Sequence, residues 1–495
     1  MKKFVLCFLV ALFPFFVFSL SHVHGFDSDW SFDDSFHWHS ALCEHTEKRK
    51  GEELHSFPSE WSKKTNYGVE LEYKKCSVCG YVSYKDNAFS SFFDIEPRLS
   101  WFGDSVVEIY PLRNIGGFVK IPTVVDKKKA TQIKQQAFMN NEGLTGVEIP
   151  DSISVVLNEC FKNCTSLQFV ILPDSIQCID YGVFQDCVSL KSILLPNSVE
   201  EIGSNAFSGC SGLYCINLPS SLWQIGNWAF KNCISLKYIS LPSRLEIIGS
   251  EAFYGCTALS SIFIPSNVRV VGLGAFNKCK NLNEIQVDSA NPYLHSVDGC
   301  LFSSDYSTII RIPCGLEAGL LIPSVVSSIE EEALMDCVGI YEVEIPNSVT
   351  RIGAKAFYGC TGLTSVEIPD SVYEIEEMTF YGCNNIKSVE LPKSLVRIGT
   401  ASFYACTSLQ SIYIPDSVNY IMGSAFYNCT SLTNVSLPEN LLYILRDTFS
   451  NCKELNSITY RGTVSQWRAL RKESNWNRGV PAEIVTCSDG TVEIK

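Results

Sequence analysis

Histidine is scarce in this sequence, and motifs for enzyme chemistry are missing from it. The 495 residues include seven histidines, and only His295 lies beyond residue 55. A Ser-His-Asp or Cys-His centre therefore cannot be assembled over most of the chain. The sequence also lacks a phosphate-binding Walker loop, a dinucleotide-binding glycine fingerprint and a zinc-protease helix motif. We therefore predict that the protein is not an enzyme.

Positive charge is also in short supply. Lysine and arginine together number 39 against 53 aspartates and glutamates, which gives a formal net charge of -14. Proteins that bind nucleic acid or anionic membrane surfaces rely on clustered basic residues to meet phosphate groups. We therefore expect neither nucleic acid nor a lipid surface to be the partner.

Long hydrophobic runs are absent except at the start of the chain. Two lysines precede an almost unbroken apolar stretch from Phe4 to Leu20, which is typical of an export signal. We expect cleavage between Ser19 and Gly25, and we assign residues 1–25 to a signal peptide. A membrane anchor is the alternative, but about 17 apolar residues is the lower limit for a span. We therefore expect a secreted or surface-located chain with no integral membrane span after signal removal.

Proline and cysteine, by contrast, recur at a fixed interval of 23 residues. An aromatic residue stands three positions before each repeating cysteine, except that Leu334 replaces it once. The repeating prolines are Pro150, Pro173, Pro196, Pro219, Pro242 and Pro265, then Pro323, Pro346, Pro369, Pro392, Pro415 and Pro438. The repeating cysteines are Cys164, Cys187, Cys210, Cys233, Cys256 and Cys279, then Cys337, Cys360, Cys383, Cys406, Cys429 and Cys452. Self-similarity at this period indicates a solenoid of stacked turns.

One repeat shows how each turn is expected to form. Residues 363–371 read LTSVEIPDS, a short alternating run that predicts one strand per turn. Pro369 has no N–H and ends that strand, and Ser371 is expected to bond backbone groups of the neighbouring turn, as Asn267 and Asn440 do in their own repeats. A single turn cannot bury its apolar face alone, so stacking must create the core.

The complete repeat resembles the BspA-type leucine-rich repeat. The pattern P-x-S-V-x-x-I-G-x-x-A-F-x-G-C-x-x-L-x-x-I-x-I is written out from Pro346 to Cys360 and beyond, and the resemblance covers roughly 118–460. It implies an α/β repeat fold: a right-handed leucine-rich-repeat solenoid with an irregular or short helical outer face. Members of this family are mostly secreted or surface-exposed bacterial proteins, and several are implicated in adhesion to host matrix proteins or to other microbes.

The 23-residue interval is broken once, by twelve additional residues before Pro323. We assign 288–322 to an insertion and predict a hairpin in it, with strands at 297–302 and 308–312. Cys300 and Cys314 flank this hairpin. A disulfide between them is possible, but their offsets from the turn do not place them opposite each other, so we favour two separate thiols.

The repeating cysteines have two interpretations. A metal or redox array would need other ligand types, but no histidine repeats with the cysteines. The alternative, a small side chain buried as a hydrophobe, is favoured because free cysteine is among the most buried residue types.

The segment 26–117 lacks the 23-residue step and contains a separate set of soft ligands. These are Cys43, His45, Cys76 and Cys79. A Cys₃His set suits tetrahedral zinc, while a disulfide that uses Cys76 with Cys79 or Cys43 is the alternative in an exported chain. The segment also resembles the small C-x-H and C-x-x-C-G modules found beside such repeats in bacterial surface proteins. In either case we expect a structural role next to the solenoid end.

The segment 461–495 follows the last repeat. It resembles the terminal segment that commonly ends this family, and it contains Trp467, Trp476 and Cys487. An uncovered last turn would expose its apolar interior and an unpaired strand edge. We therefore expect this segment to be a cap, although its tryptophans could instead bind a ligand.

The outward positions of the strands are the candidate binding surface. Near the N-terminal end, Phe169, Ile171 and Leu194 are expected to form an exposed apolar patch. Further along, four glutamates are expected to form a row of carboxylates, which favours a basic ligand or a cation; ordinary solvated variation is the alternative. The acidic set is Glu342, Glu344, Glu367 and Glu390, and the aromatic positions Phe263 and Tyr413 complete the candidates.

Three functions are compatible with these features. We favour an adhesin-like protein that binds extracellular or surface proteins of a host or of other microbes. A receptor-type recognition ectodomain and, less favoured, an enzyme or metal-handling protein are the alternatives.

The ligand set in 26–117 generates a direct test. Protein refolded under reducing conditions should contain about one zinc ion per chain, and Cys76→Ser should remove it, because a structural zinc site contributes its binding free energy to folding. Metal analysis by mass spectrometry measures the content. Native protein with a disulfide at these cysteines and no metal would contradict the zinc assignment.

Overall fold

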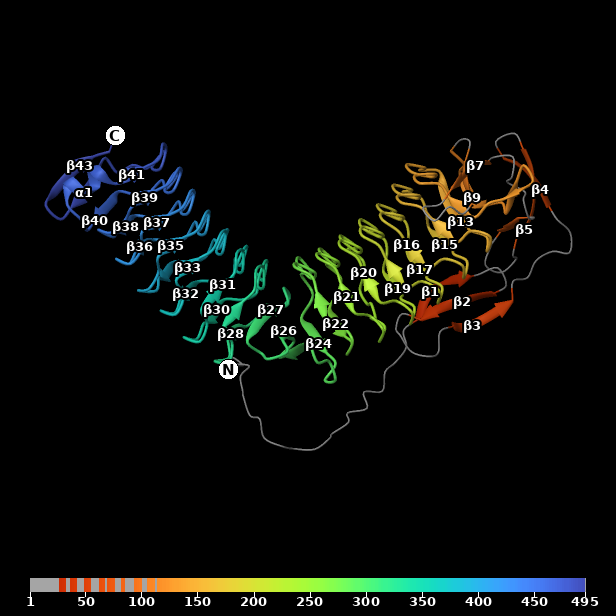
Figure 1. Ribbon diagram of the computed structural model, residues 1–495, viewed down its shortest axis with the longest axis horizontal. Coiled ribbons are helices and arrows are strands. Elements are labelled where there is room, and N and C mark those ends of the chain that lie inside the picture. The colour runs from red at the N-terminus through yellow and green to blue at the C-terminus, as the bar shows by residue number, and fades with distance from the viewer. Residues whose placement is uncertain are drawn as a thin grey trace, which may run out of the picture. The chain divides into compact units, whose positions relative to one another are not determined.

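The computed structural model describes the strands within 26–111 and the continuous chain from 114 to 494 (Figure 1). The strands before residue 112 cover 26–32, 36–41, 49–54, 62–66, 69–75, 82–84, 93–99 and 105–111. The expected signal peptide and the four expected zinc ligands Cys43, His45, Cys76 and Cys79 lie outside the described residues. The described chain falls into two compact units, one ending at Ala275 and one beginning at Phe276.

The first unit opens with antiparallel sheets. One contains β1 (Phe26–Phe32), β2 (Phe36–Ala41) and β3 (Arg49–Leu54), another contains β4 (Ser62–Asn66), β5 (Val69–Lys75) and β6 (Val82–Tyr84), and a hairpin joins β7 (Phe93–Leu99) to β8 (Ser105–Pro111). Strand β8 also pairs in parallel with β12 (Gln132–Ile133). The parallel stack of the solenoid therefore begins before residue 118.

Stacked turns form the rest of the first unit, and most turns carry two short parallel strands. The longer strands stack in one column, called the longer column, and the two-residue strands stack in another, called the shorter column. The longer column contains β9 (Gly117–Lys120), β13 (Leu144–Glu148), β15 (Phe169–Ile171), β17 (Ser192–Leu194), β19 (Cys215–Asn217) and β22 (Ser261–Ile264). The shorter column continues from β12 with β14 (Val155–Val156), β16 (Cys178–Ile179), β18 (Glu201–Ile202), β20 (Gln224–Ile225), β21 (Ile247–Ile248) and β23 (Val270–Val271), while β10 (Val124–Val125) and β11 (Lys128–Lys129) form a small hairpin.

The second unit repeats this arrangement. Its longer column contains β28 (Gly319–Leu321), β30 (Glu342–Glu344), β32 (Ser365–Glu367), β34 (Ser388–Glu390), β36 (Ser411–Tyr413), β38 (Asn434–Leu437), β40 (Ser457–Tyr460) and β42 (Ile484–Cys487), with β43 (Gly490–Glu493) antiparallel at the edge. Its shorter column contains β29 (Ser328–Ile329), β31 (Arg351–Ile352), β33 (Glu374–Ile375), β35 (Arg397–Ile398), β37 (Tyr420–Ile421), β39 (Tyr443–Ile444) and β41 (Arg471–Lys472).

The fold is a β-solenoid, and this corrects the expected α/β class. Most repeats contribute two short strands where one was predicted, and the described residues contain a single helix, α1 (Val464–Ala469). The outer face is made of tight turns in which residues adopt positive φ. Gly359 (φ 69°) and Asn428 (φ 60°) both stand just before a repeating cysteine. Glycine and asparagine tolerate this left-handed conformation, which explains the residue types at that position.

Polar side chains join successive turns as predicted. The Ser198 hydroxyl donates to the Ile176 carbonyl oxygen at 2.6 Å, and Ser371 donates in the same way to Val349. The amide of Asn267 donates to the Ser243 carbonyl oxygen at 2.8 Å. These bonds satisfy carbonyl groups that the strands leave unpaired.

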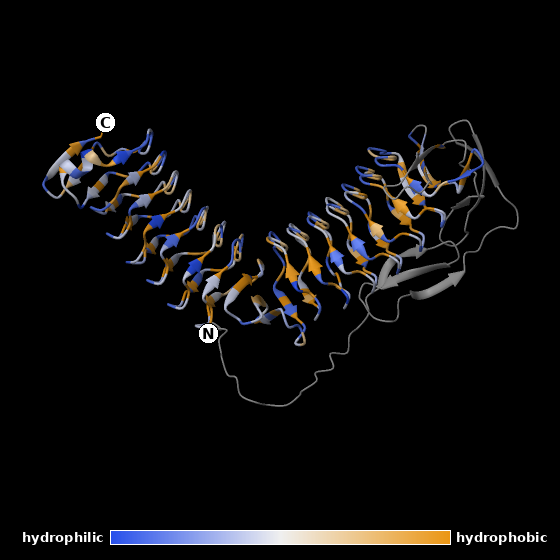
Figure 2. Ribbon diagram, viewed as in Figure 1, coloured by the Kyte–Doolittle hydropathy of each residue, from blue (hydrophilic) through white to orange (hydrophobic). Residues whose placement is uncertain are grey.

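The core is a ladder of stacked rings. Successive phenylalanines are fully buried, with ring centroids 5.0 to 5.6 Å apart in the first unit and 5.1 to 5.3 Å apart in the second. The rings are Phe138, Phe161, Phe184, Phe207, Phe230 and Phe253, then Phe357, Phe380, Phe403, Phe426 and Phe449. Figure 2 shows apolar segments recurring in each turn. Most of these rings are therefore buried by rings from the turns on either side, while Phe357 follows a turn that carries Leu334 instead.

The repeating cysteines are buried, which confirms the hydrophobic interpretation, but they also form hydrogen bonds. The Cys383 thiol donates to the Phe357 carbonyl oxygen at 3.1 Å, and Cys187 donates to Phe161 at the same distance. The equivalent bonds of Cys210, Cys233, Cys406, Cys429 and Cys452 measure 3.0 to 3.2 Å. Burial raises the pKa of Cys383 well above its ordinary value. These thiols are therefore neutral donors between turns.

The insertion forms the predicted hairpin with one additional strand. After β24 (Glu284–Val287), strands β25 (Leu294–Val297), β26 (Cys300–Ser303) and β27 (Thr308–Arg311) pair antiparallel, and β27 then pairs in parallel with β29. The first hairpin strand begins later than predicted, because a turn at Gly299 (φ 76°) separates β25 from β26. Cys300 and Cys314 are both buried thiols, so no disulfide joins them.

The segment after the last repeat packs on the apolar end of the stack. Helix α1 begins with a capping box between Thr463 and Gln466. The Trp476 ring meets Phe449 edge-on at 6.3 Å, and Trp467 is 1% exposed. Strand β42 extends the longer column in parallel with β40.

The ring ladder generates a stability prediction. Phe357→Ala should lower the free energy of unfolding by about 3–5 kcal/mol, because the ring is fully buried and stacked on Phe380, and its loss leaves a cavity. The matched control is Tyr373→Ala, which removes a ring that is 60% exposed and should cost less than about 0.5 kcal/mol. Denaturant titration measures both. A cost below about 1 kcal/mol for Phe357→Ala would show that the ladder does not carry the core.

Candidate functional site

The apolar patch of the first unit is less exposed than predicted. Leu194 is 51% exposed on β17 and Phe263 is 48% exposed on β22, but Phe169 and Ile171 on β15 are half-buried. The Phe169 ring stacks on Phe118 with centroids 5.6 Å apart. The patch therefore has freely exposed members and members already used in packing.

Phe169 lies flat over a glycine of the neighbouring strand. A Cβ atom at Gly146 would lie 2.3 Å from the Phe169 ring, so only glycine leaves room for it. Gly146 pairs with both Phe118 and Phe169 in the parallel sheet. The outward direction of Phe169 was predictable from strand alternation, but its partner across the glycine was not, because the two rings are 51 residues apart in the chain.

An ion pair borders this patch. The Lys120 ammonium group contacts the Glu148 carboxylate at 2.6 Å, and the two residues are cross-strand partners. Glu148 is 4% exposed although it occupies an outward position next to Ile171. The charge of Glu148 is therefore neutralised within the sheet.

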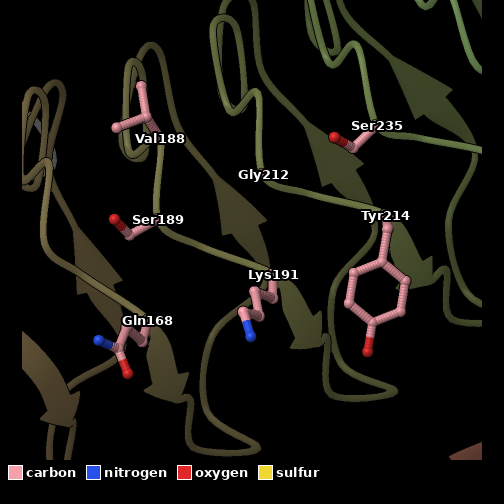
Figure 3. A pocket seen from close by; sticks show the side chains of 7 residues that line it. All are labelled: Gln168, Val188, Ser189, Lys191, Gly212, Tyr214 and Ser235. Carbon is pink, nitrogen blue, oxygen red and sulfur yellow. The ribbon is translucent and has the colours of Figure 1, made fainter. Parts of the chain in front are cut away.

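A shallow hollow of about 460 Å³ lies beside the strands of the first unit. Figure 3 shows that Gln168, Lys191 and Tyr214 come from equivalent positions of three successive turns. The other lining residues are Val188, Ser189, Gly212 and Ser235. Lys191 and Tyr214 directly precede β17 and β19, so this hollow borders the strand face. Sequence reasoning missed it, because side chains of separate repeats line it only after stacking.

The acidic row of the second unit forms as predicted. Glu342 and Glu344 lie on β30, Glu367 on β32 and Glu390 on β34, and all four are exposed. Glu367 and Glu390 are direct cross-strand partners. Among the described residues, no ion pair includes any of these four carboxylates. Like charges at this spacing repel each other.

In the neighbouring shorter column, the charged side chains form ion pairs. Its outward positions alternate in sign, as Arg351, Glu374 and Arg397 on β31, β33 and β35. Arg397 contacts Glu374 at 2.8 Å, and Arg351 contacts Glu376 at 3.0 Å. The same repeats therefore pair their charges on one face and leave the carboxylates of the other face without such partners.

An aromatic residue ends the acidic row. Tyr413 on β36 is 59% exposed, and the Arg461 guanidinium lies over its ring at 4.3 Å from the centroid. Arg461 also contacts the Asp416 carboxylate at 2.6 Å and donates to the Ser436 hydroxyl at 2.7 Å. One face of the Tyr413 ring is therefore held in place by a fixed cation, while much of the side chain remains open.

In the part of the chain that the structure describes, no three acidic, histidine or cysteine side chains lie close enough together to hold a metal ion. The arrangement offers apolar side chains in one unit and carboxylates in the other. Both kinds of surface are suited to binding.

Comparison with known proteins identifies related sequences and folds. The family model described as "BspA type Leucine rich repeat region" matches 131–222, 214–318 and 327–456. No curated protein matches the chain. A leucine rich cell surface protein from Faecalibacterium prausnitzii is 25% identical with a TM-score of 0.54, covering 76% of this chain and 96% of its own. A leucine-rich repeat protein from Bacteroides ovatus is 29% identical with a TM-score of 0.53, covering 80% and 98%.

The packing of Phe169 generates a prediction that separates it from Leu194. Phe169→Ala should lower the free energy of unfolding by about 1–2 kcal/mol, because it removes a half-buried ring stacked on Phe118. Leu194→Ala is the matched control and should change the free energy by less than about 0.5 kcal/mol. Chemical denaturation measures both values. Equal costs would show that the Phe169 ring is not held by the stack.

Proposed function

The chain belongs to the family of BspA-type leucine-rich-repeat proteins, and from this premise we propose that it is a secreted or surface-exposed, adhesin-like protein that binds extracellular host or microbial proteins through its strand faces. The solenoid fold is that of bacterial leucine-rich cell surface proteins. Among the described residues no helix is long and apolar enough to cross a membrane. Stacked repeats present extended surfaces that suit contacts with other proteins.

The exposed row of glutamates without ion-pair partners is the observation that carries this proposal. Residues 341–344, 364–367, 387–390 and 410–413 contain four glutamates and one basic residue, Lys387. Adjacent strands lie about 4.8 Å apart, so carboxylates on neighbouring turns repel one another in the free protein. A basic partner relieves this repulsion. On β31, β33 and β35, by contrast, the charges alternate in sign and form ion pairs, so that column needs no charged partner. This contrast supports the proposal.

The two surfaces are expected to act differently in binding. Exposed apolar side chains such as Leu194 and Phe263 lose water when a partner covers them and so supply affinity. Carboxylates at the surface mainly attract a basic partner over a distance, so they set the association rate and its dependence on salt. Lys191 and Tyr214 place hydrogen-bonding groups beside the apolar surface.

The acidic row can be tested with a matched pair of variants. The triple variant E344Q/E367Q/E390Q should slow association with a basic extracellular protein about fivefold at low salt and flatten the salt dependence. The control E330Q/E374Q/E376Q removes the same charge from the neighbouring column and should leave the rate nearly unchanged. The partner is first captured from host extracellular matrix on the immobilised full chain, and surface plasmon resonance then measures its rates.

The apolar surface is tested in the same assay. L194S/F263S should accelerate dissociation of the captured protein without lowering the unfolding midpoint, because both side chains are about half exposed. Phe169 is a poor probe because its ring also stabilises the sheet. If both the apolar and the acidic variants bind the captured protein like the unmodified chain, the strand faces are not the binding surface.

A further inference from the structure

A buried arginine lies beside the ring ladder of the second unit, in the insertion that interrupts the repeat. The Ile312 N–H donates to the Ala333 carbonyl oxygen as the Leu334 N–H donates to Ala356, so Ile312 takes the ladder position and Arg311 is its neighbour. Cys314 follows Arg311 by three residues and precedes Cys337 by 23. Arg311 is 4% exposed. A guanidinium group keeps its charge at all ordinary pH values, so a permanent positive charge lies in the core.

The partners of this charge are mostly uncharged. The Nη1 atom donates to the Glu332 carbonyl oxygen at 2.7 Å, and the Nη2 atom donates to the Met335 carbonyl oxygen at 3.0 Å. The Nη2 atom also donates to the Cys314 Sγ atom at 2.6 Å. Among the described residues, no ion pair includes Arg311, and its Nε atom has no hydrogen-bond partner. The closest group that can carry a neutralising negative charge is the Cys314 thiol.

Cys314 differs from the repeating cysteines of the ladder. The hydrogen bond from the Cys337 thiol lowers the pKa of Cys314 below that of an ordinary thiol, burial opposes this, and the charge of Arg311 adds to the lowering. Burial instead raises the pKa values of Cys360 and Cys383. Cys314 is therefore a buried cysteine at which the thiolate form is favoured, with a second thiol beside it.

Other charged groups also face this cluster. Burial raises the pKa of Asp336, whose Oδ2 atom has no hydrogen-bond partner in the described chain. Lys278 and Lys280 lower the same pKa, and Glu332 raises it. The repeats with an intact ring ladder have no comparable buried cation. The cluster is a property of the turn that contains Arg311.

We propose that Cys314 and Cys337 form a buried, oxidisable dithiol that reacts with low-molecular-weight disulfides and closes into a Cys314–Cys337 bond. The Cys314 thiolate attacks one sulfur of the small disulfide RSSR, which forms a mixed disulfide and releases RS⁻. Cys337 loses its proton and attacks the Cys314 sulfur, which releases a second RS⁻. In total the protein loses two electrons and RSSR is reduced to two RSH.

The contacts of the two cysteines suit this bond. The Cys337 thiol is hydrogen-bonded to Cys314, and its Sγ atom lies 3.5 Å from the Ile312 carbonyl oxygen and 3.8 Å from that of Pro313, the two residues directly before Cys314. A disulfide needs Cα atoms within about 7 Å. Cys314 is 2% exposed, so reaction requires local opening of the insertion strands β25–β27. Formation of the Cys314–Cys337 disulfide also removes the thiolate and leaves Arg311 buried without its negative partner. Oxidation should therefore lower the unfolding midpoint of the chain, and a reductant should restore it.

The experiment uses the full chain incubated with oxidised glutathione, followed by alkylation and peptide mass spectrometry. We expect a Cys314–Cys337 cross-linked peptide that forms at least about tenfold faster than Cys360 is modified in the same molecules, because the thiolate is the attacking species. Cys337→Ser should instead accumulate a glutathione adduct on Cys314. Modification of Cys314 at the same rate as Cys360, or no cross-link between Cys314 and Cys337, would overturn the proposal.

A matched pair of variants tests the role of the arginine. Arg311→Phe removes the charge and should slow the reaction of Cys314 about tenfold, while Arg311→Lys retains the charge and should preserve most of the rate. Equal rates in both variants and the unmodified chain would overturn the role of Arg311. If Arg311→Phe does not fold, the comparison of Cys314 with Cys360 in the unmodified chain still decides the proposal.

Discussion

Every turn of this solenoid depends on its neighbours to bury its rings and satisfy its backbone. A phenylalanine such as Phe380 is covered by the rings of the two adjacent turns, and its carbonyl oxygen accepts a hydrogen bond from Cys406 of the following turn. Stability is then carried by the contacts between turns, which is the general behaviour of repeat proteins. It also explains why cysteine suits its position: the side chain is small enough for the core and still donates a hydrogen bond.

The same stacking controls the surface. A residue at one outward position lies beside the equivalent residues of the neighbouring repeats. Where these residues alternate in charge, as Glu374 and Arg397 do, the charges of the face neutralise one another. Where they have the same charge, as Glu367 and Glu390 do, negative charge accumulates on the face. Function on such a fold therefore resides in the sequence of outward positions, while the inward positions build the scaffold.

The insertion shows what happens when the repeat is interrupted. The additional residues form the antiparallel strands β25–β27 and return the chain to the stack with Ile312 at the ladder position and Arg311 buried beside it. The charge of Arg311 is satisfied by carbonyl oxygens of the following turn and by a thiol of its own turn. An interruption of the repeat thus creates chemistry that the regular turns do not have.

The 23-residue spacing by itself determined the solenoid and the outward direction of the glutamates, because these properties follow from periodicity within one repeat. The burial of the cysteines followed from their residue type and the absence of repeating histidines, and the hairpin followed from the turn residues where the spacing is broken. Only the tertiary structure decided how residues of different repeats meet. It placed Phe169 over Gly146 against Phe118, gathered Lys191 and Tyr214 at one hollow and brought Arg311 to the carbonyl oxygens of Glu332 and Met335. It also decided between the irregular and the short helical outer face that the family resemblance implied, because turns with positive φ form this face. Contacts between repeats depend on the exact side-chain shapes brought together by stacking, and no spacing within the chain contains that information.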